Sequence, residues 1–392
     1  KTGSNPLFEV VNKNPRKIEG VGIDSDLLKI LLTLGGDIHI RDKNNNTLLM
    51  KALENISDID TIEYLINKSS NVNAQNDKGL YPINFALSYD LKISKLLIQK
   101  GARLNIKDYE GNNPLMLASE NGSLETIKFL VSKGFKINDK NNLGQTALNF
   151  AVRGSNQAVI EYLINNGADA TNSHLKYDLI YTYNTSFRNV LFENIDLLLK
   201  GGFDINEVDK DGNNLLIKTN SKNISTSFLD YIITKGFDIN HKNNFGENIL
   251  FSELKKDINS EVIIFLLNKN IDINNKNKNA FELFLESEST NEEILLKFLN
   301  KNNRPLQSEY RYLFHKKSDF LDTVLKNIDL DYYLKDIKFI NSLFNYLVAN
   351  KIKNNLINTL ISKGFDLNTK NSDGDTLLIK SILDNNPNLF NQ

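Results

Sequence analysis

The sequence predicts an all-α solenoid of roughly 12 stacked helix-turn-helix units joined by hairpin loops, with two of the units degenerate. Three observations predict this fold. One phrase recurs about every 33 residues, a second phrase keeps step with it, and apolar positions are spaced as on one face of a helix. A helix pair of this size cannot bury its apolar face alone, so neighbouring units must stack.

The first recurring phrase is a glycine, a variable residue, Asp or a similar residue, an aliphatic residue and then Asn. Copies end at intervals of 34, 32, 33, 33, 35, 34 and 34 residues between residues 39 and 274. Seven successive intervals of nearly equal length are not expected by chance. The clear copies end at Asn105, Asn138, Asn206, Asn240 and Asn368, and the weaker ones at His39, Asn73, Thr171 and Asn274.

The second phrase is a capping residue, an apolar pair and then Ala or another small or apolar residue. Thr and Asn begin most copies, and their side-chain oxygens cap helix N-termini. An apolar stripe such as Ile127, Leu130 and Val131 follows at helical spacing and ends at Gly134, a helix C-cap. Each unit is therefore expected to be a short helix, a tight turn, a longer helix and a polar hairpin loop. Copies begin at Thr47, Pro82, Asn113, Thr146, Asn214 and Thr376.

The array is not uniform along the chain. We expect an array over residues 1–300 with an atypical unit near 172–200, because that stretch lacks the capping phrase. Residues 301–350 are expected to hold degenerate repeats, and residues 351–392 a terminal repeat and cap.

The unit at residues 108–134 carries the pattern best. It reads Asp108-Tyr-Glu-Gly111-Asn-Asn-Pro114-Leu-Met-Leu-Ala118, and it resembles the ankyrin-repeat family phrase D-x-x-G-x-T-P-L-H-x-A-A. It departs from that phrase at Asn113, Met116 and Ser119. The unit at 138–167 is nearly as similar, and the resemblance covers about 35–300 and again 350–392.

The resemblance implies a non-enzymatic scaffold that recognises a protein partner through the concave face and the hairpin tips of an ankyrin solenoid. It does not identify the partner. A divergent catalytic or targeting module at 302–350 is the alternative, although the spacing leaves room there for degenerate repeats. We expect the scaffold to act as a monomer.

Two sets of positions are left free by packing and are candidate partner-binding residues. The middle residues of the D-x-x-G loop lie at the hairpin tip, and most are polar. Exposed aromatics are enriched in binding surfaces, although each could instead fold back onto its neighbouring hairpin. Positions just after the Ala of the short helix should face the concave side, or be ordinary solvated helix ends. The candidates are Tyr109, Leu143 and Phe245 at the tips, and Glu54, Tyr89, Glu120 and Arg153 on the short helices.

Four phenylalanines take the place of the family's Ala after the glycine that begins the first recurring phrase. An aromatic ladder for a ligand is one interpretation, and core packing between adjacent units is the one we favour, because large aromatics are usually buried. They are Phe135, Phe203, Phe237 and Phe365.

Composition argues against several other function classes. Lys plus Arg is 47 and Asp plus Glu is 48, and this balance disfavours a dedicated nucleic-acid binder. The chain has no Cys and only 4 His, so we expect no metal site and no Cys nucleophile. A solenoid builds no deep cleft in which catalytic groups could share a pocket, so we also expect no cofactor and no catalytic site. The sequence contains no run of 18 apolar residues, so we expect no membrane-spanning helix. Asn is unusually common, and we assign that abundance no function by itself.

The compartment stays open between cytoplasmic and exported. The sequence begins at Lys1 without an initiator Met, so a removed export signal is one of the alternatives.

Overall fold

The computed structural model describes most of the chain in detail. It describes residues 5–12, 25–55, 59–68, 71–171, 174–184, 188–219, 224–256, 258–275, 279–287, 289, 291–301, 321–327, 333, 335–349, 360–376 and 379. The chain divides into two compact units, residues 1–207 and residues 208–392.

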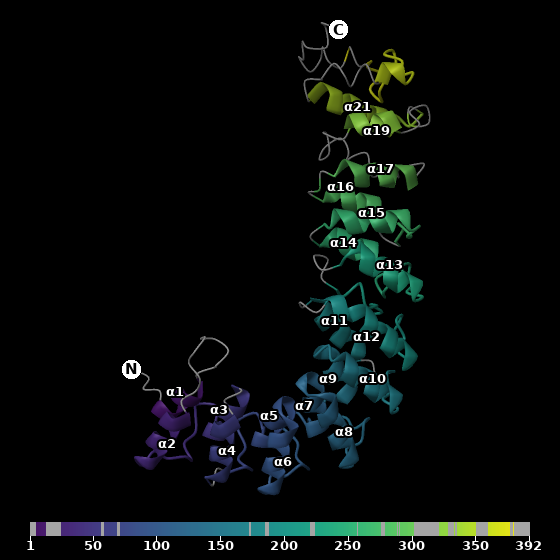
Figure 1. The fold of residues 1–392 in the computed structure, drawn as a ribbon. Helices are drawn as coiled ribbons and strands as arrows, with labels where there is room; N and C mark the ends of the chain where they lie inside the picture. The colour runs from purple at the N-terminus through teal and green to yellow at the C-terminus, as the bar shows by residue number, and fades with distance from the viewer. Residues whose placement is uncertain are drawn as a thin grey trace. The chain divides into compact units, whose positions relative to one another are not determined.

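In its described residues, the first unit contains six helix pairs. The pairs stack so that first helices contact first helices and second helices contact second helices, which produces two layers (Figure 1). The first helices are α1 (Pro6–Asn12), α3 (Leu48–Glu54), α5 (Pro82–Tyr89), α7 (Pro114–Asn121), α9 (Ala147–Arg153) and α11 (Leu175–Asn184). The second helices are α2 (Ser25–Thr33), α4 (Ile59–Asn67), α6 (Leu91–Gln99), α8 (Leu124–Ser132), α10 (Gln157–Asn165) and α12 (Arg188–Lys200).

The second unit continues the same pattern in its described part. Helix α14 packs on α16, and α15 packs on α13 and α17. Its helices are α13 (Thr226–Thr234), α14 (Ile249–Lys255), α15 (Ser260–Asn268), α16 (Ala280–Glu286), α17 (Glu292–Lys301), α19 (Leu321–Asn327) and α21 (Ile337–Ala349). Residues 302–320 lie outside the described residues, so the described part of 302–350 is mainly α19 and α21.

The all-α prediction is confirmed. In the part of the chain that the structure describes, extended pairing is limited to two isolated bridges, Arg41 with Thr47 and Lys370 with Thr376. The atypical stretch near 172–200 also contributes a helix pair, because α11 packs on α9 and α12 packs on α10.

Side-chain caps begin several of the predicted short helices. The Thr47 hydroxyl accepts from the Met50 N–H at 3.2 Å, and Asn113 Oδ1 accepts from the Met116 N–H at 3.0 Å. Asn214 differs from the prediction. Its Oδ1 accepts from the Ile217 N–H at 3.2 Å, but only turns follow at 215–218, so the cap starts no α-helix there.

An acidic or amide side chain organises seven hairpin loops of the described residues. Its Oδ1 accepts from the backbone N–H groups two and four residues further on, as at Asp108, where Glu110 and Asn112 donate at 3.0 and 2.8 Å. Gly111 then turns the chain at φ 81°, and a Cβ there would lie 2.4 Å from Asn142 Oδ1 of the next loop. The same pair of backbone hydrogen bonds recurs at Asp42, Asn76, Asn141, Asp209, Asn243 and Asn371.

These loops are joined in pairs by buried asparagines. Asn112 donates its amide to Asp108 Oδ2 at 2.8 Å, and its Oδ1 accepts from Asn141 Nδ2 of the next loop at 2.7 Å. We call this chain of side-chain hydrogen bonds the relay. It links an Asp to the Asn four residues on, and that Asn to the first Asn of the following loop. It recurs in Asp42, Asn46 and Asn76 and again in Asp209, Asn213 and Asn243.

The asparagine that ends the first recurring phrase also joins units. Asn73 Nδ2 donates to the Gly101 carbonyl at 2.9 Å, and Asn73 Oδ1 accepts from the Arg103 N–H at 2.9 Å. Asn138 makes the same two bonds with Gly167 and Asp169. Several of the asparagines, whose abundance in the composition had no assigned function, therefore join one unit to the next.

The relay predicts that an Asn→Asp substitution destabilises the chain when the asparagine belongs to the relay and has little effect when it does not. Asn141→Asp removes the donor to Asn112 Oδ1 and leaves that buried acceptor facing a carboxylate, so the free energy of unfolding should fall by about 1–3 kcal/mol. Asn142→Asp is the matched control, because Asn142 is exposed and its side-chain amide donates to the Tyr109 carbonyl at a longer 3.3 Å. Urea unfolding midpoints of the two variants measure the difference, and equal midpoints would contradict the role of the relay.

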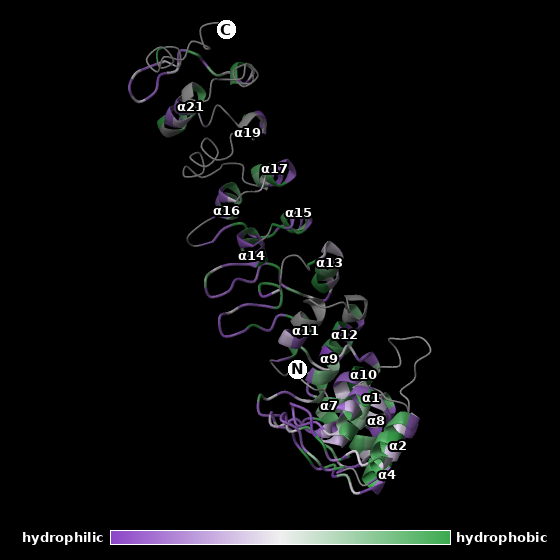
Figure 2. Ribbon diagram, turned by 90° about the vertical axis from the view of Figure 1, so that its left-hand side faces the viewer, coloured by the Kyte–Doolittle hydropathy of each residue, from purple (hydrophilic) through white to green (hydrophobic). Residues whose placement is uncertain are grey.

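Three of the four phenylalanines that follow the glycine of the first recurring phrase are core residues. Phe203, Phe237 and Phe365 are buried, whereas Phe135 is partly exposed. This placement supports packing between units over an aromatic ladder. The loops themselves are hydrophilic and project to one side of the helix layers (Figure 2).

Candidate functional site

The predicted hairpin-tip residues are among the most exposed apolar side chains of the described residues. The exposed fractions of Tyr109, Leu143 and Phe245 are 65%, 61% and 66%. Tyr109 lies against the preceding loop, because a Cβ on Gly79 would come within 2.9 Å of its ring. Most of its surface still faces solvent, so contact with the neighbouring loop and availability to a partner are compatible.

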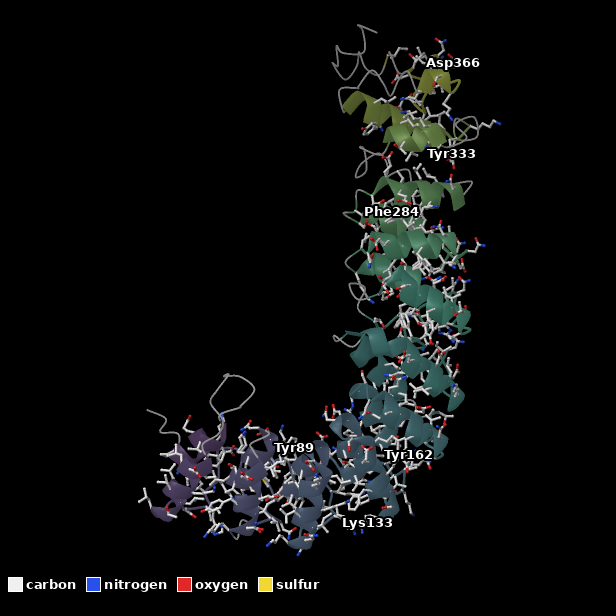
Figure 3. The ribbon with its side chains drawn as sticks, in the orientation of Figure 1. Tyr89, Lys133, Tyr162, Phe284, Tyr333 and Asp366 are labelled. Atoms are coloured by element: carbon white, nitrogen blue, oxygen red, sulfur yellow. The ribbon has the colours of Figure 1, made fainter. Side chains whose placement is uncertain are left out.

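A pocket of about 310 Å³ opens on the first helices of three consecutive pairs. Glu54 comes from α3, Tyr89 from α5 and Glu120 from α7, so the pocket unites three of the four residues predicted to face this side. Figure 3 shows Tyr89 on the side of the first helices, opposite Lys133 near the second helices. We call the surface that α3, α5 and α7 form here the first-helix face.

The number of residues between each side chain and the N-cap of its helix explains which side chains meet in the pocket. Phe85 and Leu117 both lie four residues after the N-cap of their helix, Tyr81 or Asn113. Glu54, Ser88 and Glu120 all lie seven residues after their N-cap. Residues three or four apart share a helix face, so both rows point to the same side. The small Ser88 lies between two longer glutamates in this register, and all five residues line the pocket.

Glu54 and Glu120 are the charged groups among the lining residues. Glu54 forms an ion pair with Lys51 one turn earlier on α3. Glu120 forms no ion pair with any described residue, although its charge contributes to the raised pKa of Asp178. The pocket is therefore apolar at its walls and acidic at its edge.

Arg153, the fourth predicted residue of this row, does not line the pocket. Its guanidinium lies over the Phe150 ring at 4.2 Å, and its Nε lies 3.5 Å from Asp178 Oδ1. Burial raises the pKa of Asp178 to about 6, while the hydrogen bond from Asn149 Nδ2 at 2.7 Å and the charge of Arg153 lower it. Arg153 Nε and Nη2 are buried without a hydrogen-bond partner among the described residues.

Sequence reasoning missed the apolar part of the pocket. Leu80, Phe85 and Leu117 were not identified as site residues, although they line it. Counting from each cap would have placed Phe85 and Leu117 in one row, but Leu80 lies in the preceding loop and has no helical register.

The described ranges contain neither a metal-ligand cluster nor a membrane-spanning helix. There, no three His, Asp or Glu side chains are placed to hold a metal ion. His241 Nε2 lies 2.7 Å from the Gly212 carbonyl of the preceding loop, which suits a role in joining loops. Among the helices that the structure describes, none is both long and apolar enough to cross a membrane.

Comparison with known proteins identifies the repeat. Residues 20–108 and 103–174 match the family model described as ankyrin repeats (3 copies). A protein of Fowlpox virus (strain NVSL), named as an ankyrin repeat protein, is 30% identical over 105 residues, which are 26% of this chain and 19% of that protein. A Rickettsia bellii (strain RML369-C) protein with the same kind of name is 31% identical over 124 residues, 29% of this chain and 37% of that protein.

The chain thus spans well under half the length of these two relatives. Ankyrin repeats are a general protein–protein interaction fold, and their homologues are typically non-enzymatic scaffolds. The capped helix pairs, the loops built on Asp or Asn, and the matched sequences show that residues 20–174 form ankyrin repeats, and the described helices of the second compact unit stack in the same way.

Proposed function

We propose that this chain is a non-enzymatic scaffold that binds a protein partner through its first-helix face, the concave face in the family, and through its hairpin tips. The pocket that joins Glu54, Tyr89 and Glu120 from three consecutive pairs carries the proposal. A site assembled from successive units suits an extended partner, because each unit adds a contact along one line.

The hairpin tips support the proposal independently of the pocket. Tyr109, Leu143 and Phe245 keep more than half of their surface in solvent. Aromatic side chains are enriched at interfaces because they bury a large area and lose little conformational freedom. A phosphate backbone would meet two carboxylates at the pocket, so a protein fits this surface better than a nucleic acid does.

Combining Tyr109→Ala with Phe245→Ala tests the proposal. We expect the pair to weaken partner capture about tenfold or more, which is the usual loss when interface aromatics are truncated. Melting and helicity should stay nearly unchanged, because both side chains are exposed. The partner is first isolated by affinity capture and mass spectrometry on the intact chain, and its affinity for each variant is then measured.

The matched control combines Leu34→Ala with Ile361→Ala. These are also exposed apolar residues, one in each compact unit, and neither lies at a hairpin tip. The control should leave the partner's affinity unchanged. Undiminished capture by the tip pair would contradict the proposal, and unfolding by that pair would show that the tips are part of the core.

A further inference from the structure

We propose that the pocket on the first-helix face is a subsite for one arginine side chain, which an extended segment of the partner inserts. This inference rests on the proposed function and names the chemistry of the partner at one position. It follows from a comparison of two units of the array.

The two repeat units are those of α5 and α9, and they share an aromatic residue but differ one turn later. Phe85 and Phe150 both lie four residues after their N-caps, Tyr81 and Thr146. Seven residues after the cap, the later unit has Arg153 and the earlier one has Ser88. The same position on the two helices therefore holds a guanidinium in one unit and a hydroxymethyl group in the other.

The chain's own arginine covers the ring in the later unit. The Arg153 guanidinium stacks 4.2 Å from the centre of the Phe150 ring, and Phe150 is 5% exposed. Arginine stacks on aromatic faces through its planar, weakly hydrated cation. In the earlier unit, Ser88 leaves the corresponding space open, and Phe85 is partly exposed in the wall of the pocket.

Charge around the open position favours a cation. Glu54 and Glu120 line the pocket from the units before and after Phe85, and no lysine, arginine or histidine lines it. Glu54 is already paired with Lys51, but Glu120 has no ion-pair partner among the described residues. Arginine can donate to a carboxylate while its planar group stays on an aromatic ring.

The walls fit the rest of an arginine side chain. Leu80, Leu117 and Tyr89 supply apolar surface for its three methylene groups. Arginine buries such a stem along apolar surface while its head makes polar contacts. At about 310 Å³ the pocket is at the lower end of the range for ligand sites, so it suits one side chain better than a folded element.

Binding of short synthetic peptides to the intact chain tests the proposal. We expect a pentapeptide with arginine between glycines to bind at least tenfold more tightly than the same peptide with citrulline, its uncharged isostere. NMR titration or calorimetry measures both dissociation constants. Equal affinity for the two peptides would overturn the proposal, because shape alone would then explain the binding.

Two variants connect the binding to the pocket. Ser88→Arg supplies the guanidinium from the chain itself, as Arg153 does in the later unit, and should abolish binding of the arginine peptide. Ser132→Arg, at an exposed position of α8, is its control. Glu54→Gln with Glu120→Gln should weaken the same peptide at least tenfold, whereas Glu125→Gln on α8 should not. If both pocket variants bind the peptide normally, the subsite is elsewhere and the proposal fails.

The two proposals fail in different ways. If the tip pair weakens partner capture while the arginine and citrulline peptides bind alike, the scaffold function stands and the subsite does not. If capture of the partner is unaffected by the tip pair, the proposed function fails whatever the peptides show.

Discussion

Phe298→Ala is expected to lower the free energy of unfolding of the second compact unit by about 3–5 kcal/mol, the usual range for removing a fully buried phenylalanine. Phe298 on α17 has no exposed surface, and its ring lies 5.4 Å from Phe281 and 5.6 Å from Phe284 on α16. The substitution removes both ring contacts and leaves a cavity between α17 and α16.

Phe245→Ala is the matched control, because it makes the same chemical change in the same compact unit at a residue that is 66% exposed. Its effect should stay within about 0.5 kcal/mol. Urea unfolding followed by circular dichroism measures both variants. Similar losses for the two would contradict the burial difference.

The loss from Phe298→Ala should also be local. In a solenoid each pair contacts mainly its neighbours, so stability is close to a sum of units and of interfaces between them. Hydrogen exchange should speed up first in α15 to α17 and leave α5 to α9 of the other compact unit unchanged. An equal increase in all of these helices would show that the chain unfolds as one cooperative body.

The repeat architecture could be predicted from the sequence because caps, glycines and apolar stripes recur together. Thr47 and Asn113 cap helices as the phrase predicts, and Gly111 turns its loop. The same phrase at Asn214 was misleading, since the cap bond forms but only turns follow. A cap satisfies the first N–H groups of a helix and does not extend the helix by itself.

The candidate site could be predicted only in part. Positions after the short-helix Ala identified Glu54, Tyr89 and Glu120, which the structure brings together. Arg153 fits the same pattern, yet it stacks on Phe150 of its own helix. The pattern predicts which side of the helix a side chain points to. It does not predict what the side chain contacts, because that depends on the residue one turn earlier, here Phe150. The loop asparagines were underestimated for a similar reason, because their partners lie 29 or 30 residues away.

Helix α14 holds a buried acid, Glu253, that the repeat pattern does not require. Glu253 lies five residues after the N-cap Asn248 of α14. At the corresponding positions four other units have Ala52, Ala86, Ala118 and Ala151, all with no exposed surface. Glu253 also has no exposed surface, and neither carboxyl oxygen has a hydrogen-bond partner among the described residues.

Burial therefore raises the pKa of Glu253 from 4.5 to about 7, and the nearby charge of Lys256 opposes the shift only in part. The folded state binds a proton that the unfolded state releases between these values. The stability that comes with this proton is complete below pH 4.5 and is lost as the pH rises through about 7. Because one pKa unit corresponds to about 1.4 kcal/mol, the loss by pH 8 is about 3 kcal/mol.

Glu253→Gln should remove this loss. Compared with the unaltered chain, we expect it to be similar in stability at pH 4 and to gain up to about 3 kcal/mol at pH 8. Part of the gain is offset because Lys256, which donates to the Thr219 carbonyl at 2.8 Å, loses an attractive charge. Glu253→Ala restores the residue that the other units have and should also abolish the pH dependence.

Urea unfolding at several values between pH 4 and pH 8 gives the difference curve for each variant. Glu261→Gln on α15 is the control, since it removes a carboxylate from an exposed position of the neighbouring helix. Asp178 is a second buried acid, with a pKa raised by burial to about 6, and it lies in the first compact unit. Asp178→Asn therefore separates its contribution to the pH dependence from that of Glu253. A difference curve for Glu253→Gln that stays flat from pH 4 to pH 8 would mean that the folded state solvates this carboxylate by opening α14, and the burial argument would then fail.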